Sequence, residues 1–202
     1  MSLEVPLKKL SVLVYLGAIF LFTRGVRAQE LDAAFGVGTM NAPSPTANSN
    51  TASLNGGAYP AFSADFILKR RIGIGGELAW RGTRSVFQEI QPYRPLFYDF
   101  NGIYAPKLSK HVTAEMMAGI GWESIRLYQP FTTCGFTSCT DFVSSNHFLG
   151  HFGGGLRYYV WGQLFVRPEA HLYLIHNNVE FNSAHAVRYG ISIGYTFGGP
   201  GF

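Results

Sequence analysis

Large apolar residues occupy every second position near the end of the chain. They are Val187, Tyr189, Ile191, Ile193, Tyr195 and Phe197, and small or polar residues stand between them. A period of two residues predicts a β-strand with one apolar and one polar face. We therefore expect a strand over residues 188–197.

The same alternation recurs along the chain and predicts an all-β domain of eight strands. The other seven segments are 31–40, 59–68, 72–81, 96–104, 112–124, 147–159 and 164–174. Each approaches the roughly 9–11 residues that a tilted membrane-spanning strand needs. Pro168 lies within one of them and cannot donate a ladder hydrogen bond, so we expect a bulge or a missing bond there.

The connections between these segments alternate in length. Short ones cover 69–71, 105–111 and 160–163, and long ones cover roughly 41–57, 82–95, 125–146 and 175–186. This order predicts an antiparallel up-and-down barrel with all short turns at one end. Outer-membrane barrels have short periplasmic turns and long extracellular loops.

One face of the predicted strands carries most of their charge. Its charged and titratable residues are Asp32, Asp65, Glu77, Arg81, Asp99, Glu115, Glu123, Arg157, Arg167, Glu169, His171 and Arg188. A soluble barrel would turn this face to water and use lysine there, yet none of these segments contains lysine. The composition instead favours a barrel interior in which acids and bases pair, because unpaired buried charge is costly.

The apolar face is then directed to lipid. Its aromatic residues near strand ends match the interfacial girdles of membrane proteins, as with Trp80, Tyr98, Trp122, Tyr158 and Tyr195. The pattern therefore favours an eight-stranded transmembrane β-barrel over a soluble barrel of lipocalin type. We expect Arg157 to lie opposite or diagonal to Glu169 and the paired charges to plug the interior.

The start of the chain resembles an export signal. Lys8 and Lys9 precede an apolar run over residues 10–22, which is too short to span a membrane as a helix, and Ala28 ends a small-residue cleavage pattern. We expect a signal peptide over 1–28, cleaved near Ala28 and Gln29, and a barrel domain over 29–202. The alternative is a short anchor that is never cut.

Removing that segment changes the charge of the protein. The full chain has 16 Lys+Arg and 12 Asp+Glu, and residues 1–28 hold four of the bases and one of the acids. The remaining chain is nearly neutral. No clustered basic face of the kind that binds nucleic acid is expected.

The chain after residue 28 resembles small eight-stranded outer-membrane barrels of the OmpA-like and OmpX-like type. The ending "GISIGYTFG" is similar to the last strand of such proteins, where an aromatic residue serves as the assembly signal; Phe197 and Phe202 are both candidates. The resemblance implies a bacterial outer-membrane location, and contact with outer-membrane lipid and lipopolysaccharide. It also implies recognition by the barrel-assembly machinery and an unidentified extracellular ligand of the long loops.

Cys134 and Cys139 lie close together in the third long connection. An exported pair predicts a disulfide rather than a zinc site, which needs four ligands.

The histidines raise the question of an enzyme. The stretch 174–185 is similar to the His-x-Ser-Asn region of lipid A deacylase barrels, but His176 is followed by Asn177 and Asn178, without a serine at the matching place. We assign no catalytic, cofactor-binding or metal-binding residue and expect no cofactor. The sequence favours a non-enzymatic outer-membrane barrel with a structural or surface-binding role. A deacylase-like hydrolase and a narrow porin-like channel are the alternatives.

Overall fold

The structure is a computed structural model that describes residues 30–43, 53–68, 71–87, 91–134, 139–177, 180–181 and 184–198. The predicted signal peptide, most of the first long connection and Phe202 lie outside these residues. Within the described ranges, no helix has the length and apolar character that crossing a membrane would require.

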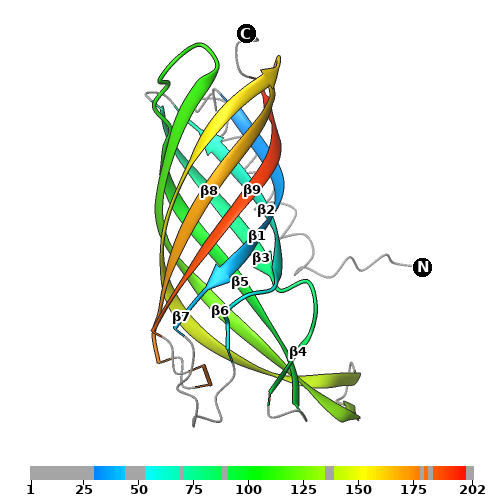
Figure 1. Ribbon diagram of the computed structural model, residues 1–202. Helices are drawn as coiled ribbons and strands as arrows, with labels where there is room; N and C mark the ends of the chain where they lie inside the picture. Colours follow the sequence, from blue (N-terminus) through cyan, green and yellow to red (C-terminus); the bar gives the residue numbers. More distant parts are fainter. Residues whose placement is uncertain are drawn as a thin grey trace, which may run out of the picture.

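Eight long strands form one closed antiparallel barrel, and a ninth, short strand is attached at one end (Figure 1). The strands are β1 (Glu30–Asn41), β2 (Ala58–Ile67), β3 (Ile72–Trp80), β4 (Ser85–Phe87), β5 (Gln91–Tyr104), β6 (Val112–Cys134), β7 (Cys139–Trp161), β8 (Leu164–Ile175) and β9 (His185–Phe197). Among the described residues, neighbours in sequence pair with each other except for β3 and β4; β1 pairs with β9, and β3 pairs with β5 beyond the small β4–β5 hairpin. The predicted eight-stranded barrel is thereby confirmed.

Short turns gather at one end of the barrel, which is the upper end in Figure 1. The tightest joins β7 to β8 through Gly162 and Gln163, and Gly162 has a φ of 57°, a value that glycine adopts without strain. The long connections lie at the opposite end. The chain therefore has the asymmetry that predicts short periplasmic turns and long extracellular loops.

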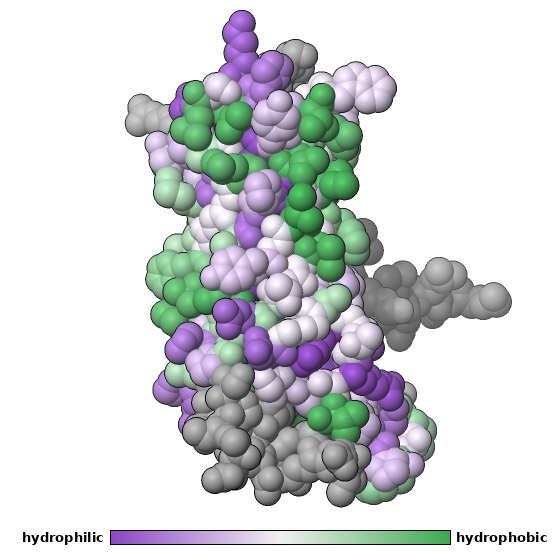
Figure 2. All heavy atoms as spheres, viewed as in Figure 1, coloured by the Kyte–Doolittle hydropathy of each residue, from purple (hydrophilic) through white to green (hydrophobic). Residues whose placement is uncertain are grey.

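The alternation of side chains along the strands decides which face is turned outward. Figure 2 shows hydrophobic residues over the outer wall of the barrel. Half-exposed examples are Phe35, Phe62, Ile74, Phe100, Met116, Ile120, Phe152, Leu156, Ile191 and Ile193. The intervening residues point into the barrel, so the apolar face is the outer one, as the sequence predicts.

Two predicted loops are instead strands for much of their length. β6 and β7 have 23 residues each, and they continue through most of the segment 125–146 that the sequence assigned to a loop. The alternation breaks down there: Ile125 and Tyr128, three positions apart, are both buried in β6, and residues 139–146 of β7 are mostly small or polar, so the segment does not stand out as a strand pattern. The segment 82–95 likewise contains β4 and the start of β5.

Pro168 interrupts one ladder without shifting it. β7 and β8 pair Gly155 with Glu169 and Tyr158 with Val166, and the two intervening positions are skipped in both strands. The register is the same on both sides of this gap. The proline therefore causes missing hydrogen bonds rather than a bulge, because its nitrogen has no hydrogen to donate.

Candidate functional site

The barrel interior contains a layer of acidic and basic side chains, most of them joined by ion pairs, which we call the ionised layer. Eleven of the twelve charged and titratable residues assigned to the interior from the sequence are buried. Arg81 is the twelfth; it is half-buried, and its guanidinium donates hydrogen bonds to the backbone carbonyls of Ser53 and Asn55 in the first long connection. It fastens that connection to the barrel instead of joining the ionised layer.

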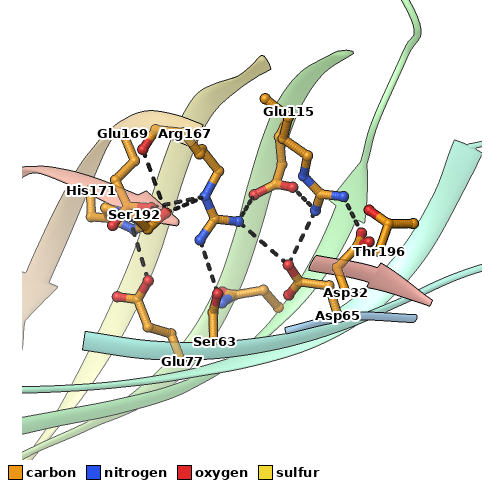
Figure 3. Close-up of polar contacts among 12 residues, drawn as sticks. Asp32, Ser63, Asp65, Glu77, Glu115, Arg167, Glu169, His171, Ser192 and Thr196 are labelled. Atoms are coloured by element: carbon orange, nitrogen blue, oxygen red, sulfur yellow. Dashed lines mark hydrogen bonds and ion pairs between the residues drawn. The ribbon is translucent and has the colours of Figure 1, made fainter. Parts of the chain in front are cut away.

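Arg167 lies at the centre of this layer (Figure 3). Its Nη1 lies 2.6 Å from Glu115 Oε1, its Nε lies 2.9 Å from Glu169 Oε2, and its Nη2 donates to the hydroxyl of Ser63. The side chains come from β8, β6 and β2, so one guanidinium joins three parts of the wall. Charge-assisted bonds of this kind are about twice as strong as neutral ones.

Arg157 makes a second set of bridges. From β7 it contacts Asp32 on β1, Asp65 on β2 and Glu115 on β6. The expected register is present, since Glu169 pairs with Gly155 and so lies diagonal to Arg157. The expected mutual neutralisation is absent: Arg157 reaches across the lumen, while Glu169 bonds to its own neighbour Arg167.

Toward the long-loop end, Arg188 lies between two carboxylates, at 2.6 Å from Glu77 and 3.3 Å from Glu169. His171 is within 3.6 Å of both, and its Nδ1 lies 3.0 Å from Nε2 of His151. The donor atoms of Glu77, Glu169 and His171 are close enough together to hold a metal ion. The guanidinium of Arg188 already supplies positive charge to both carboxylates, so the group works as an ion-pair cluster.

An aromatic layer closes the lumen beyond the charges, at the long-loop end. Its buried residues are Leu54, Tyr59, Tyr93, Phe97, Tyr173 and Phe181. Phe97 stacks on Tyr173 with ring centroids 4.9 Å apart, and the Tyr173 hydroxyl donates to Glu77, which joins this layer to the ionised one. Sequence reasoning missed the layer because inward-facing aromatics interrupt the alternation instead of extending it.

The outer end of the barrel bears an arm, which we define as residues 127–134 and 139–147 of β6 and β7. β5 pairs with β6 no further than Leu127, and β8 pairs with β7 only from Leu149 inward. Beyond these points the two strands pair with each other, and they extend at the lower right of Figure 1. Cys134 and Cys139 form a disulfide across the arm near its tip.

A small polar cluster lies where the arm meets the barrel. The imidazole Nε2 of His147 is 2.9 Å from a carboxylate oxygen of Glu180 and 3.2 Å from the hydroxyl of Ser145. A hydrolytic triad needs the acid and the nucleophile on different nitrogens of the ring. Here both approach the same nitrogen, so the carboxylate is not placed to orient the ring for attack by Ser145.

Comparisons with known proteins agree with this architecture. No family model and no curated protein sequence matches the chain. Among solved structures, Neisserial surface protein A is similar with a TM-score of 0.60 and 10% identity, over 85% of this chain and 99% of the other. Ail, the attachment invasion locus protein of Yersinia pestis, is similar with a TM-score of 0.54 and 11% identity, over 84% and 99%. Another structure of Ail contains the heparin analogue sucrose octasulfate.

The N-terminal barrel of Pseudomonas aeruginosa OprF is also similar, with a TM-score of 0.53 and 11% identity over 84% of this chain and 98% of that one. Each of these covers more than four fifths of this chain. The chain has the fold of a small eight-stranded outer-membrane β-barrel. This likeness concerns the fold, and the interior side chains described above are properties of this chain.

The filled interior leads to a prediction about conduction. An eight-stranded barrel is just wide enough to be filled by side chains, and here the ionised and aromatic layers lie one behind the other. The purified, folded protein should therefore show no single-channel steps in planar-bilayer recording, and Arg157→Ala alone should stay silent because the aromatic layer remains. A 16-stranded porin serves as the positive control. Reproducible steps from the wild type would refute the closed lumen.

Proposed function

We propose that this protein is a non-enzymatic barrel of the bacterial outer membrane whose arm binds a macromolecule at the cell surface. The observation that carries the proposal is the length of β6 and β7. At 23 residues each they exceed the other barrel strands, which have 9 to 14 residues. At about 3.3 Å per residue, the seven residues beyond Leu127 extend the hairpin by roughly 20 Å.

The surface of the arm suits binding. Phe131 is 63% exposed and Val143 is 52% exposed, although neither lies on the lipid-facing wall. Exposed aromatic and aliphatic side chains on a projecting element are typical of interaction sites. A rigid element also loses little conformational entropy on binding.

The base of the arm is braced. Tyr128 is buried against the guanidinium of Arg84, which lies 3.6 Å from its ring centroid, and its backbone carbonyl accepts a bond from Gln91. The disulfide constrains the other end. The edge of β7 that faces away from β6 has no strand partner from Cys139 to Asn146 among the described residues. Such an edge can pair with an extended segment of another chain.

Two further observations support the proposal. Ail has been solved with a heparin analogue bound, so a barrel of this fold can bind a ligand. The shared nitrogen in the cluster of Ser145, His147 and Glu180 argues against hydrolysis. The purified protein should accordingly leave the acyl chains of lipopolysaccharide and phospholipid intact when the products are analysed by mass spectrometry.

Site-specific photo-crosslinking tests the surface role. A photoreactive phenylalanine analogue at position 131 should form adducts with macromolecules that are added to intact cells. The same analogue at position 152, on the lipid-facing wall, is the matched control and should form no such adducts. If the analogue at position 131 forms no more adducts than the analogue at position 152 with any of the added macromolecules, the arm is not the binding element.

A further inference from the structure

Two turns at the short-turn end of the barrel are rich in basic residues. All three lysines after residue 28 occur in the segments 69–71 and 105–111. The described members of this group are Arg71, Lys107, Lys110 and His111, which we call the basic turns. The third turn, at Gly162 and Gln163, has no charge.

The basic turns lie side by side on the rim. Ile72 pairs with Tyr104, and the backbone nitrogen of Ala105 donates to the carbonyl of Arg71 at 2.7 Å. Lys107 forms an ion pair with Glu30 at 3.4 Å. Arg71, Lys110 and His111 are exposed and have no carboxylate partner among the described residues. The result is a local excess of positive charge on one sector of the rim.

An apolar groove of about 510 Å³ begins next to this sector, on the lipid-facing wall of β3, β5 and β6. Its floor includes Gly102 and Ala118, which pair across the β5–β6 ladder, and its sides include Ile72, Tyr104 and Met116. The groove exists because Gly102 and Ala118 have small side chains, and the larger neighbouring side chains form its borders. Ile72 directly follows Arg71, so the groove and the positive charge are adjacent.

We propose that this groove and the basic turns bind one anionic phospholipid from the inner leaflet of the outer membrane. An acyl chain lies in the groove, where only apolar surface meets it, and the phosphate lies between Arg71 and the 107–111 turn. Short turns of outer-membrane barrels are periplasmic, which places the site at the level of that leaflet. Basic residues near a membrane surface favour anionic lipids, and arginine binds phosphate with directed hydrogen bonds.

A water-soluble polyanion fits the observations less well, because it would use the charges and leave the groove exposed. A neutral lipid would use the groove and leave the charges without a counter-charge. The site thus selects for both parts of one molecule. The inference does not depend on the surface role of the arm, which lies at the other end of the barrel.

Native mass spectrometry of the detergent-purified protein tests the site, with phosphatidylglycerol and phosphatidylethanolamine of identical acyl chains offered at equal concentration. The wild type should retain phosphatidylglycerol roughly tenfold better, which corresponds to about 1.4 kcal/mol. The double variant Arg71→Gln/Lys110→Gln should bring the ratio close to one. The charge-matched control Arg94→Gln/Arg126→Gln, at the long-loop end, should keep it.

Filling the groove separates the contribution of the acyl chain from that of the headgroup. Gly102→Leu should reduce retention of both lipids several-fold and leave the ratio unchanged. A Cβ at Gly102 meets only the carbonyl of Ala118, at 3.7 Å, so the change is sterically tolerated. Gly150→Leu is the matched control on the lipid face outside the groove lining, because a Cβ there has no atom within 4 Å.

Heat-modifiable migration on gels shows which variants are folded, and Ala118→Leu replaces Gly102→Leu if the latter does not fold. Equal retention of the two lipids by the wild type would overturn the proposal. So would a preference that survives Arg71→Gln/Lys110→Gln, or binding that Gly102→Leu and Gly150→Leu reduce alike.

Discussion

Replacing Arg167 by methionine should destabilise the barrel by about 3–5 kcal/mol. The guanidinium of Arg167 is 1% exposed and contacts Glu115, Glu169 and Ser63. Methionine keeps much of the volume but leaves three buried carboxylates, those of Asp65, Glu115 and Glu169, with one fewer counter-charge each. Urea-induced unfolding in lipid vesicles, followed by tryptophan fluorescence, measures the change in the free energy of unfolding.

Two comparisons separate loss of charge pairing from loss of packing. Arg126→Met, on the half-exposed surface near the arm, should cost less than about 1 kcal/mol, since among the described residues that side chain contributes a cation–π contact with Phe142 and no ion pair. Adding Glu169→Gln to Arg167→Met should recover part of the loss, because it removes one of the carboxylates that has lost a counter-charge. Equal costs for Arg167→Met and Arg126→Met would mean that the interior pairs are not stabilising.

Replacing Met116 by arginine should cost about 2–4 kcal/mol through a different mechanism. Met116 points to lipid from β6 and is 52% exposed. Val143 on the arm is also 52% exposed, so Val143→Arg is a matched control that should change stability by less than about 0.5 kcal/mol. The same unfolding assay applies. An unchanged stability of Met116→Arg would contradict the assignment of this face to the membrane.

Gly119 provides the opposite test on the inner side of the same strand. A Cβ there would overlap the backbone carbonyl of Phe100 and the amide oxygen of Asn101. Arginine at this position should therefore prevent folding by overfilling the interior, in detergent as well as in lipid. The difference between the two positions lies in whether the arginine meets lipid or protein.

The period-two pattern was sufficient to predict the barrel and its faces. Each strand has one buried and one exposed side, so a residue such as Phe152 or Ile193 is placed by its neighbours in sequence alone. The segment 112–124 was predicted from its start at Val112, and only its end was wrong. β6 continues to Cys134 because its partner β7 continues beside it, which is information that one strand does not contain.

The sequence did not predict which acidic residue pairs with which basic residue. Neighbouring strands suggested Arg157 with Glu169, but a side chain that points into a narrow lumen meets those from the opposite wall as readily as those beside it. Arg157 accordingly contacts Asp32, which is 125 positions away. Pairing across the lumen depends on the tilt and stagger of all eight strands together. The place of Arg81 at the rim follows from the same geometry.

The acidic and basic members of the interior ion pairs come from different parts of the chain, and this order affects how the barrel can assemble. Their arginines come from β7, β8 and β9, as Arg157, Arg167 and Arg188, whereas most of their carboxylates come from β1, β2, β3 and β6. A partly built wall of the early strands would hold inward-facing acids whose counter-charges had not yet arrived. Burying those unpaired carboxylates in the membrane would cost free energy. Insertion and closure should therefore occur together, when the last three strands bring their guanidinium groups into place.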